Sequence, residues 1–410
     1  MTGPTDKTGH TDGTGPEPPP QEPGSADGGS RAGHWGEVLV ASLRLAAPAI
    51  AGYALLRLFG VLFLWLWARQ RGQDVWWLLG ERWDSSWYIG IAENGYHQSI
   101  PVGPDGEPIT TNLAFFPVYP TLMRALAAVL PISVPTAGLV ITWTASLVAA
   151  WGIFMVGHHL YGRRAGIVLA LLWGVLPHAV VQSMGYTEAL FTAVASWTLY
   201  ALLTRRWLTA GALCVLAGLT RPNAAALIAA IGLAAMVAIW RRQDGWRPWV
   251  GAAIAPLGWL GFLAWVGYRL NRIDGWFYVQ GDIWGSSFDG GRYTIRTLNA
   301  VLTEEKVMFV PYVVAGVLAV VAVLLVLGVL DRQPWPLLLY STLVVVTTVG
   351  GTGYFHTNPR HMLPAFTLLL PVAAAAVRMR LRSLVAIISL LAVASAWFGG
   401  YLALLWRFSP

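Results

Sequence analysis

The chain has very few charged side chains. Only 11% of its 410 residues are Asp, Glu, Lys or Arg, whereas 56% are hydrophobic. A soluble globular domain carries about 25% charged residues. So few charges cannot cover a surface that faces water on all sides, and this excludes a soluble globular fold. The mean hydropathy of +0.56 agrees with that conclusion.

Cysteine and lysine are nearly absent. The single cysteine, Cys214, lies in an apolar run, so no disulfide can form within the chain. All but two of the 27 basic residues are arginine, and the arginines stand in short clusters between apolar runs. The net charge of +7 therefore reflects the excess of basic residues in the cytoplasmic loops of membrane proteins, and it does not indicate nucleic-acid binding.

The motifs of several common chemistries are also missing. The sequence has no Walker A loop, no Gly-x-Gly-x-x-Gly after a strand, no His-Glu-x-x-His and no Cys/His ligand set. Nothing supports ATP hydrolysis, dinucleotide binding or a zinc site. We therefore expect no metal ligand and no cofactor.

Long apolar runs, in contrast, recur from about residue 47 to the C-terminus. Each is close to the ~20 residues that cross a bilayer as a helix. They predict an all-α, polytopic transmembrane protein with about ten or eleven spans. The predicted spans are 45–68, 136–158, 165–182, 188–203, 207–219 (short for a full crossing), 223–240, 249–268, 307–330, 335–348, 363–377 and 384–406.

The N-terminal residues have a different composition. Residues 1–34 are rich in Gly, Pro, Thr, Asp and Glu and lack an apolar period, which predicts a disordered cytoplasmic tail before a transmembrane domain over 35–410. A basic segment followed by a short apolar run and a cleavage site is missing, so no signal peptide is predicted.

Arginine clusters predict the orientation of the spans. They occur at every second connection, which places those connections in the cytoplasm and the others, including the loops 69–135 and 269–306, outside. Within the first outer loop, 113–130 contains Pro117 and Pro120 and is predicted to be a re-entrant or interfacial helix. Arg69 and Arg71 alone favour the opposite insertion, but the five later clusters outweigh them. The clusters are Arg163/Arg164, Arg205/Arg206, Arg241/Arg242/Arg247, Arg332 and Arg378/Arg380/Arg382.

The most informative stretch follows the first span and reads Arg82-Trp83-Asp84-Ser85-Ser86-Trp87-Tyr88. A carboxylate close to the membrane is costly unless it is solvated or paired. Asp84 is therefore either a solvated member of an interfacial aromatic belt or a functional carboxylate. The residues alone leave both interpretations open.

Further charged residues gather on the predicted outer side. Each of them alone fits a helix cap or a structural ion pair. Their shared side favours a site, because a carboxylate with convergent arginine and histidine groups suits a phosphorylated lipid head group. These residues are Glu188 at the start of a span, Arg221 in the turn Arg221-Pro222-Asn223, and His356, Arg360 and His361 in a third connection.

Two motifs in order resemble the PIG-V-type mannosyltransferases, the second mannosyltransferase of glycosylphosphatidylinositol assembly and its bacterial relatives, which are GT-C membrane glycosyltransferases. The first continues the stretch around Asp84 as Ile91-Ala92-Glu93-Asn94-Gly95-Tyr96, and the second is Ala114-Phe115-Phe116-Pro117-Val118-Tyr119-Pro120. The stretches Tyr186-Thr187-Glu188-Ala189-Leu190-Phe191, Thr220-Arg221-Pro222-Asn223 and Arg360-His361-Met362-Leu363-Pro364 are similar to further family motifs. The resemblance runs from about residue 45 to the end.

The resemblance implies an activity. A polyprenyl-phosphate sugar, usually mannose, would be the donor and co-substrate. The hydroxyl of an unidentified lipid, glycan or protein acceptor would attack the anomeric carbon with inversion, without a metal, at the extracytoplasmic face of a bacterial cell membrane. Ser85 and Ser86 stand where eukaryotic members often have Gly and another small residue, so the acceptor and the sugar stay open.

The resemblance also implies roles for particular residues. Asp84 would orient or deprotonate the acceptor hydroxyl. A set of basic residues would bind the donor phosphate, namely Arg82, Arg221, His356, Arg360 and His361. Supporting residues would be Trp83, Tyr88, Glu93, Tyr96, Phe116, Tyr119, Tyr186, Glu188 and Asn223.

Two other classes of protein fit parts of the pattern. Charged residues and broken helices also mark transporters and lipid flippases. Against these, the two halves of the chain show no internal repeat, and the polar residues gather at one face rather than at mid-membrane. An inactive scaffold for cell-wall assembly is the third alternative.

Overall fold

The structure is a computed structural model, and it describes residues 28–304 and 308–410. The chain divides into two units, residues 1–44 and residues 45–410. The predicted tail falls outside the described residues up to residue 27, as do residues 305–306 of the predicted outer loop 269–306. Helix α1 begins at Gly28, so residues 28–34 are helical rather than disordered as the composition predicts.

Residues 45–410 are built from helices, and the described part of the chain contains no β-strand, only two isolated bridges. The longer helices are α1 (Gly28–Gln70, which begins in the first unit), α3 (Asp84–Asn94), α4 (Val118–Val129), α5 (Val134–Tyr161), α6 (Arg163–Gly174), α7 (Glu188–Leu203), α8 (Trp207–Gly218), α9 (Ala224–Trp240), α10 (Arg247–Ile254), α11 (Leu257–Leu270), α13 (Arg292–Thr303), α14 (Phe309–Leu330), α15 (Trp335–Val349) and α18 (Leu381–Leu404).

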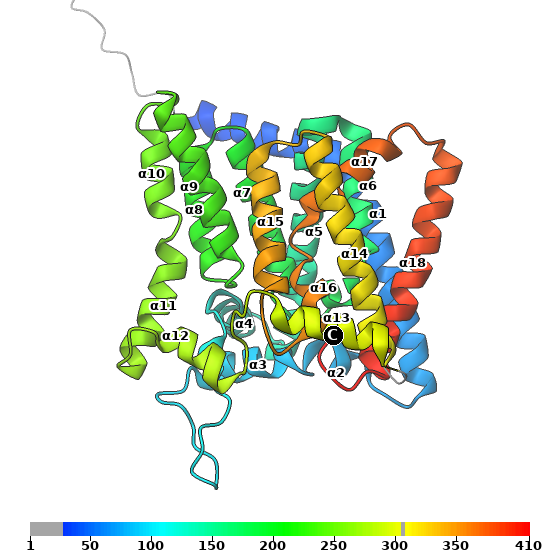
Figure 1. Cartoon of the computed structure of the whole chain (residues 1–410). Coiled ribbons are helices and arrows are strands. Elements are labelled where there is room, and N and C mark those ends of the chain that lie inside the picture. Colours follow the sequence, from blue (N-terminus) through cyan, green and yellow to red (C-terminus); the bar gives the residue numbers. More distant parts are fainter. Residues whose placement is uncertain (1–27, 305–307) are drawn as a thin grey trace, which may run out of the picture. The chain divides into compact units, whose positions relative to one another are not determined.

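Short elements connect these helices. They are α2 (Val75–Gly80), η1 (Asn112–Ala114), η2 (Ala179–Ser183), α12 (Gly275–Tyr278), η3 (Val279–Ile283, a π-helical turn), η4 (Phe355–Thr357), α16 (Asn358–His361), η5 (Phe366–Leu369) and α17 (Leu370–Ala376). Of these, α2, α12 and α16 lie toward the same end of the bundle as α3 and α13 in Figure 1.

Five helices among the described residues are long and apolar enough to cross a membrane. They are Gly36–Gln70, Val134–Tyr161, Arg247–Leu270 (α10 and α11 counted together), Phe309–Leu330 and Leu381–Leu404. Shorter apolar helices, among them α7, α8, α9 and α15, run beside them in one bundle (Figure 1). The predicted all-α, polytopic membrane protein is confirmed.

Three predicted spans differ from a continuous α-helix. The span predicted over 165–182 is wrong beyond Gly174, where α6 ends and a non-α segment, residues 175–187, begins. The span predicted over 249–268 is divided into α10 and α11 beside Pro256. The span predicted over 363–377 is α-helical only in α17, which follows the 3₁₀ turn η5. Proline explains the first two interruptions, because Pro177 and Pro256 lack the amide hydrogen that an α-helix needs and clash with the preceding turn.

The non-α segment 175–187 lies among the helices, where its backbone carbonyls need partners other than water. Side chains from four other helices supply them. The bonds run from Ser395 of α18 to the Leu176 carbonyl (2.8 Å), Arg57 of α1 to Ala179, Trp143 of α5 to Ser183 (3.0 Å), Ser85 of α3 to Gly185 (3.1 Å) and Thr142 of α5 to Tyr186 (3.2 Å). The position of residue 188, which follows directly, is therefore set by several neighbouring helices.

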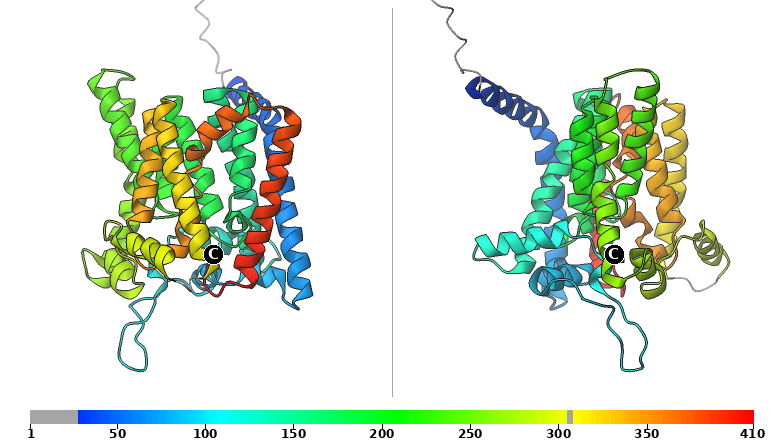
Figure 2. Two further views of the ribbon diagram at one scale, coloured as in Figure 1. Left: turned by 45° about the vertical axis from the view of Figure 1, so that its right-hand side comes forward. Right: turned by 90° about the vertical axis from the view of Figure 1, so that its left-hand side faces the viewer.

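Helix α4 corresponds to the predicted interfacial helix. Figure 2 shows it lying across the direction of the long helices, at the end of the bundle where α3 also lies. Pro120 falls in the first turn, where the missing amide hydrogen would have no intrahelical partner in any case. Tyr119 and Met123 bury one face of α4, whereas Leu122 and Val129 are exposed on the other.

Close packing between α8 and α11 depends on a glycine. A Cβ atom at Gly258 would lie 2.1 Å from the carbonyl oxygen of Val215, a backbone atom that cannot rotate away. We expect Gly258→Ala to lower the free energy of unfolding by about 1–3 kcal/mol, because the helices must separate. The matched control is Gly261→Ala on the same helix, where a Cβ meets nothing within 4 Å. Equal apparent melting temperatures of the two variants in detergent would contradict the prediction.

Candidate functional site

Four charged residues that are far apart in the sequence meet at one end of the bundle. Asp84 is the first residue of α3, Glu188 is the first residue of α7, Arg221 lies in the turn between α8 and α9, and Arg360 lies in α16. Helix α7 runs from Glu188 to Leu203, so the arginine cluster that follows Leu203 lies at the opposite end of that helix. The elements α3 and α16 mark the site's end of the bundle in Figure 1.

These four residues form a chain of alternating charges. Arg360 Nη2 pairs with Asp84 Oδ2, and Arg360 Nε pairs with Glu188 Oε1. The same Glu188 oxygen also pairs with Arg221 Nη1 at 2.7 Å. Glu188 thus holds both arginines, and Arg360 links the two carboxylates. We call these four residues the charge cluster.

The side chain of Asp84 is much more exposed than the other three side chains of the charge cluster. The Asp84 side chain is 26% exposed, whereas those of Glu188 and Arg360 are 1% and 5% exposed. Two buried atoms, Glu188 Oε2 and Arg221 Nε, have no hydrogen-bond partner among the described residues. Asp84 therefore lies at the mouth of the cluster, where a substrate from solvent would meet it first.

Arg360 is the centre of the charge cluster. Burial lowers the pKa of its guanidinium, but the carboxylates of Asp84 and Glu188 outweigh burial and raise that pKa well above its usual value. Its guanidinium carbon lies 4.4 Å from the ring centroid of Tyr186, a cation–π contact. Arg360 is therefore a fixed, permanently charged group with carboxylates on two sides.

The backbone is unusual just before Asp84. Trp83 has φ = +56°, a left-handed conformation that is rare for a bulky side chain. Such strain costs about 1–3 kcal/mol and is typical of functional sites. It allows α3 to begin at Asp84, so that the carboxylate stands in the first turn, where the helix dipole favours a negative charge.

Tyrosines and threonines surround the charge cluster. Arg221 Nη1 donates to Thr187 Oγ1 at 2.8 Å, and the Tyr88 hydroxyl lies 3.2 Å from the same oxygen. The ring of Tyr88 packs edge-on against Tyr119, whose hydroxyl donates to the Gly138 carbonyl at 2.9 Å. Tyr88 thus reaches the cluster through Thr187, and Tyr119 lies one layer behind it.

Arg82 and Asn223, two further predicted site residues, lie beside the charge cluster without an ion pair. Arg82 donates from Nη1 to the Ala403 carbonyl at 3.0 Å and packs over Trp83 at 4.0 Å from the ring centroid. No carboxylate pairs with it among the described residues. Asn223 donates to the His361 carbonyl at 3.3 Å, which ties α9 to the segment that carries Arg360.

Three predicted site residues lie elsewhere. Glu93 is exposed near the end of α3. Tyr96 donates to the Phe115 carbonyl at 2.8 Å and packs against Trp265 of α11, and Phe116 is buried against Phe262 of the same helix. These two aromatic residues anchor the loop after the first span to α11, and no hydrogen bond or ring contact joins them to the charge cluster among the described residues.

Ser409 is a neighbour of the charge cluster that the sequence analysis did not identify. Arg360 Nη1 donates to Ser409 Oγ at 2.9 Å, and the Tyr186 hydroxyl lies 3.2 Å from that oxygen. Ser409 lies beyond the last apolar run, in no recognisable motif, so no pattern in the sequence could have found it.

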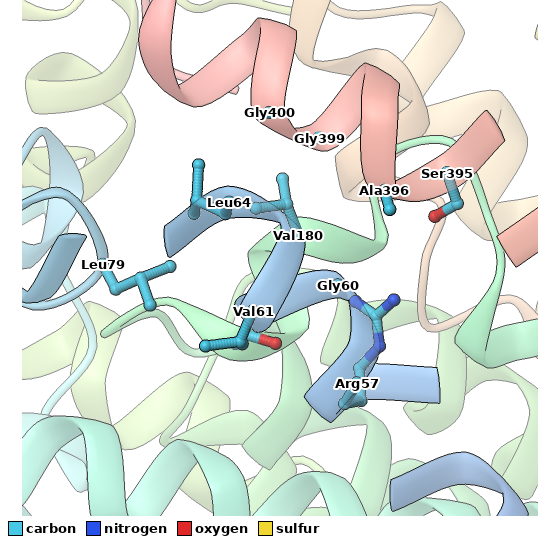
Figure 3. Close-up of a pocket in the computed structure, with 11 residues that line it drawn as sticks. Arg57, Gly60, Val61, Leu64, Leu79, Val180, Ser395, Ala396, Gly399 and Gly400 are labelled. Carbon is cyan, nitrogen blue, oxygen red and sulfur yellow. The ribbon is translucent and has the colours of Figure 1, made fainter. Parts of the chain in front are cut away.

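Two cavities lie away from the charge cluster. The first, of about 10 Å³, is lined by Arg57 and by small and apolar residues of α1, α2, η2 and α18 (Figure 3). The second, of about 190 Å³, is lined by Arg205, Arg241 and apolar residues of α7, α9 and α15. Neither contains a member of the charge cluster. No group of three potential metal ligands is found over residues 28–304 and 308–410, and metal independence stays a prediction.

Two histidines flank Arg360 and give the site a pH dependence. Burial, followed by the charge of Arg360, lowers the pKa of His356 from 6.5 to about 4. Burial and the charges of Arg360 and Arg221 lower the pKa of His361 to about 3. Both imidazoles are therefore neutral in the folded protein, whereas the unfolded chain takes up protons below about pH 6.5.

We expect stability to fall as the pH drops from about 6.5 towards 4, because only the unfolded state binds the extra protons in that range. The measurement is the apparent melting temperature of purified protein at several pH values. A His361→Gln variant should show a shallower decline. A decline of equal slope in wild type and variant would contradict this account.

No protein-family profile and no curated protein matches the chain. Solved structures do match. ArnT from Cupriavidus metallidurans bound to undecaprenyl phosphate has a TM-score of 0.51 and 15% identity, over 81% of this chain and 61% of ArnT. The apo state of that ArnT has a TM-score of 0.49, with the same identity and coverage. The apo oligosaccharyltransferase of Archaeoglobus fulgidus has a TM-score of 0.46 and 15% identity, over 87% of this chain and 55% of that chain.

The match to ArnT at a TM-score of 0.51 shows that the chain shares an all-α, polytopic membrane fold with that structure. The chain spans about three fifths of the length of the ArnT structures, at 61%. The resemblance to the PIG-V-type branch stays a prediction.

Proposed function

We propose that this protein is an inverting glycosyltransferase that uses a polyprenyl-phosphate sugar as donor and the hydroxyl of an acceptor as nucleophile. The charge cluster is the observation that carries this proposal. It combines a partly exposed carboxylate with buried guanidinium groups, the two kinds of group that such a reaction needs. The ArnT structure with the same type of fold was solved with undecaprenyl phosphate bound, which supports a donor of that chemical class.

In the proposed reaction, Asp84 and Arg360 of the charge cluster have separate roles. The acceptor oxygen forms a bond to the anomeric carbon of the donor sugar as the bond from that carbon to the phosphate oxygen breaks. The hydroxyl proton passes to the carboxylate of Asp84, which lies at the mouth of the cluster. The polyprenyl phosphate leaves with the bonding electron pair, and Arg360 stabilises its developing charge.

Glu188 and Arg221 position Arg360 rather than react. Glu188 Oε1 accepts from both arginines, so it fixes the direction of the Arg360 guanidinium relative to Asp84. A guanidinium held in advance costs little reorganisation when the phosphate charge develops. Arg82, His356 and His361 are proposed to add positive or hydrogen-bonding groups around the phosphate.

Mannose is the proposed sugar, because the two motifs around Asp84 and Phe116 resemble mannosyltransferases. The proposed location is a bacterial cell membrane, with the charge cluster on the extracytoplasmic face. That orientation rests on the arginine clusters, which lie at the other ends of the helices. A transporter or flippase is not favoured by the fold.

The proposal is tested by incubating purified protein with radiolabelled polyprenyl-phosphate mannose and a membrane extract that contains acceptors. Asp84→Asn is expected to lower the transfer rate by about 10²–10⁴-fold, the usual contribution of a general base. The matched control is Asp105→Asn, which neutralises an exposed carboxylate in the hairpin 101–109 of the first loop. Equal transfer by wild type and Asp84→Asn would rule out the assigned role of Asp84.

A further inference from the structure

The residues after α18 return to the charge cluster. Helix α18 ends at Leu404, and the following residues, which we call the 406–410 segment, cover Arg360. The ring of Trp406 packs against Phe408 at a centroid distance of 5.3 Å, and the ring of His356 lies 5.4 Å from Phe408. These aromatic contacts hold Ser409 and Pro410 against the guanidinium.

The three nitrogens of Arg360 have unequal partners. Nη2 pairs with Asp84 and Nε pairs with Glu188, so a carboxylate faces each of them. Nη1 donates to Ser409 Oγ at 2.9 Å and, more weakly, to a main-chain oxygen of Pro410 at 3.4 Å. The Ser409 hydroxyl is a neutral acceptor, and no Asp or Glu side chain pairs with Nη1 among the described residues. The Nη1 edge is thus the edge of Arg360 that an anion can take without breaking an ion pair with Asp84 or Glu188.

Charge balance favours the same edge. The charge cluster contains two carboxylates and two guanidiniums, so it is neutral as a unit, and an added phosphate needs a further cation nearby. Arg82 is such a cation, because no carboxylate pairs with it among the described residues. Its Nη1 atom donates to the carbonyl of Ala403 in the last turn of α18 at 3.0 Å. Arg82 therefore lies beside the end of α18 from which the 406–410 segment continues.

We infer that the phosphate of the donor binds at the Nη1 edge of Arg360, in the place that Ser409 and Pro410 occupy, and that the 406–410 segment must move away for the donor to bind. This inference rests on the proposed function and adds the position of the phosphate and the segment that competes with it. In this exchange a phosphate oxygen replaces the neutral Ser409 hydroxyl, and a charge-assisted hydrogen bond is about twice as strong as one to a neutral acceptor. Asp84 and Glu188 keep their ion pairs throughout.

The first test compares two variants of similar size at position 409. Ser409→Asp places a carboxylate on the Nη1 edge, whereas Ser409→Asn keeps that position neutral. The probe is undecaprenyl phosphate, titrated into purified protein in detergent and followed by tryptophan fluorescence. We expect Ser409→Asp to bind the lipid about tenfold more weakly than Ser409→Asn. In Ser409→Asp the lipid phosphate must displace a carboxylate from Arg360 Nη1, whereas in Ser409→Asn it displaces a neutral group. Inorganic phosphate and undecaprenol, titrated separately, show whether the head group alone or the lipid tail accounts for binding.

A second test follows the segment itself. Phe408→Ala removes the aromatic contact that holds the segment, and it is expected to tighten undecaprenyl phosphate binding severalfold, because less of the protein starts in the covered state. The control is Phe277→Ala on α12, an exposed ring that packs against Trp259 and Trp276. In a Cys214→Ser background, the thiol introduced by Ser409→Cys should react faster with maleimide when undecaprenyl phosphate is present, and undecaprenol should not change its rate.

The outcomes separate this inference from the proposed function. If Ser409→Asp and Ser409→Asn bind equally well while Arg360→Gln loses binding, the phosphate contacts Arg360 elsewhere and the inference is overturned, but the function stands. Slower labelling in the presence of undecaprenyl phosphate would mean that the segment closes over the lipid, which also overturns it. If wild type and Arg360→Gln bind undecaprenyl phosphate equally, the role of Arg360 in the proposed function fails as well.

Discussion

Replacing Arg360 with glutamine is expected to lower the rate of sugar transfer by about 10²–10³-fold, the cost of losing one preorganised donor to developing charge. Stability should fall as well, by about 3–5 kcal/mol, because the variant leaves carboxylates without their partner in a buried site. Arg360 is only 5% exposed, so solvent cannot compensate for the loss. The measurements are the transfer rate at saturating donor and the apparent melting temperature.

The conservative variant Arg360→Lys sharpens this test. Lysine keeps the positive charge but lacks the planar fork that reaches Asp84, Glu188 and the Nη1 edge at the same time. We expect Arg360→Lys to recover part of the stability and little of the transfer rate. The control is Arg272→Gln, which breaks an exposed ion pair with Asp274 and should leave the apparent melting temperature almost unchanged, because solvent screens that pair. If Arg360→Lys transfers sugar at the wild-type rate, charge alone suffices and the forked geometry is irrelevant.

The second large effect is expected for Glu188→Gln. Glu188 is 1% exposed, and its Oε1 atom is the acceptor that both Arg221 and Arg360 share. Glutamine has nearly the same shape but no charge, so two buried guanidiniums would be left with Asp84 as their remaining carboxylate. Breaking a buried pair of this kind costs about 3–5 kcal/mol.

This variant should also test whether Glu188 acts on the reaction by positioning Arg360 and not only by stabilising the fold. Because Glu188 positions Arg360, transfer should fall together with donor affinity, and lowering the temperature to restore folding should not restore the rate. The comparison is Asp274→Asn, which removes the carboxylate of an exposed pair. An unchanged melting temperature in Glu188→Gln would show that the arginines find other acceptors, and the proposed positioning role would have to be given up.

The sequence was a good guide to the spans, because the length of an apolar run follows directly from the thickness of a bilayer. The prediction for 188–203 coincides with α7, and the one for 207–219 differs from α8 by one residue. The errors fall at prolines. Around Pro177 and Pro256 the composition stays apolar while the helix stops, and hydropathy cannot detect the break because it does not register the missing amide hydrogen.

The charge cluster could be predicted only in part. Alternating spans place Asp84, Glu188, Arg221 and Arg360 on one side, and the structure brings these four together. Which carboxylate pairs with which arginine depends on side-chain packing between helices, and no periodicity in the sequence encodes it. Motif membership, in contrast, does not imply proximity to the charge cluster. Phe116 belongs to a motif yet packs against Phe262 of α11.

The pairing of Asp84 with Arg360 joins residues that are 276 positions apart, and that of Glu188 with Arg360 spans 172. A ribosome delivers the N-terminal part of a chain first, at about 5–20 residues per second. Asp84 and Glu188 must therefore wait for tens of seconds in the growing chain before the guanidinium that joins them is synthesised. Until then no partly inserted form of the protein can carry out the proposed chemistry, and a ribosome that stalls before residue 360 leaves a product without the guanidinium that the chemistry requires.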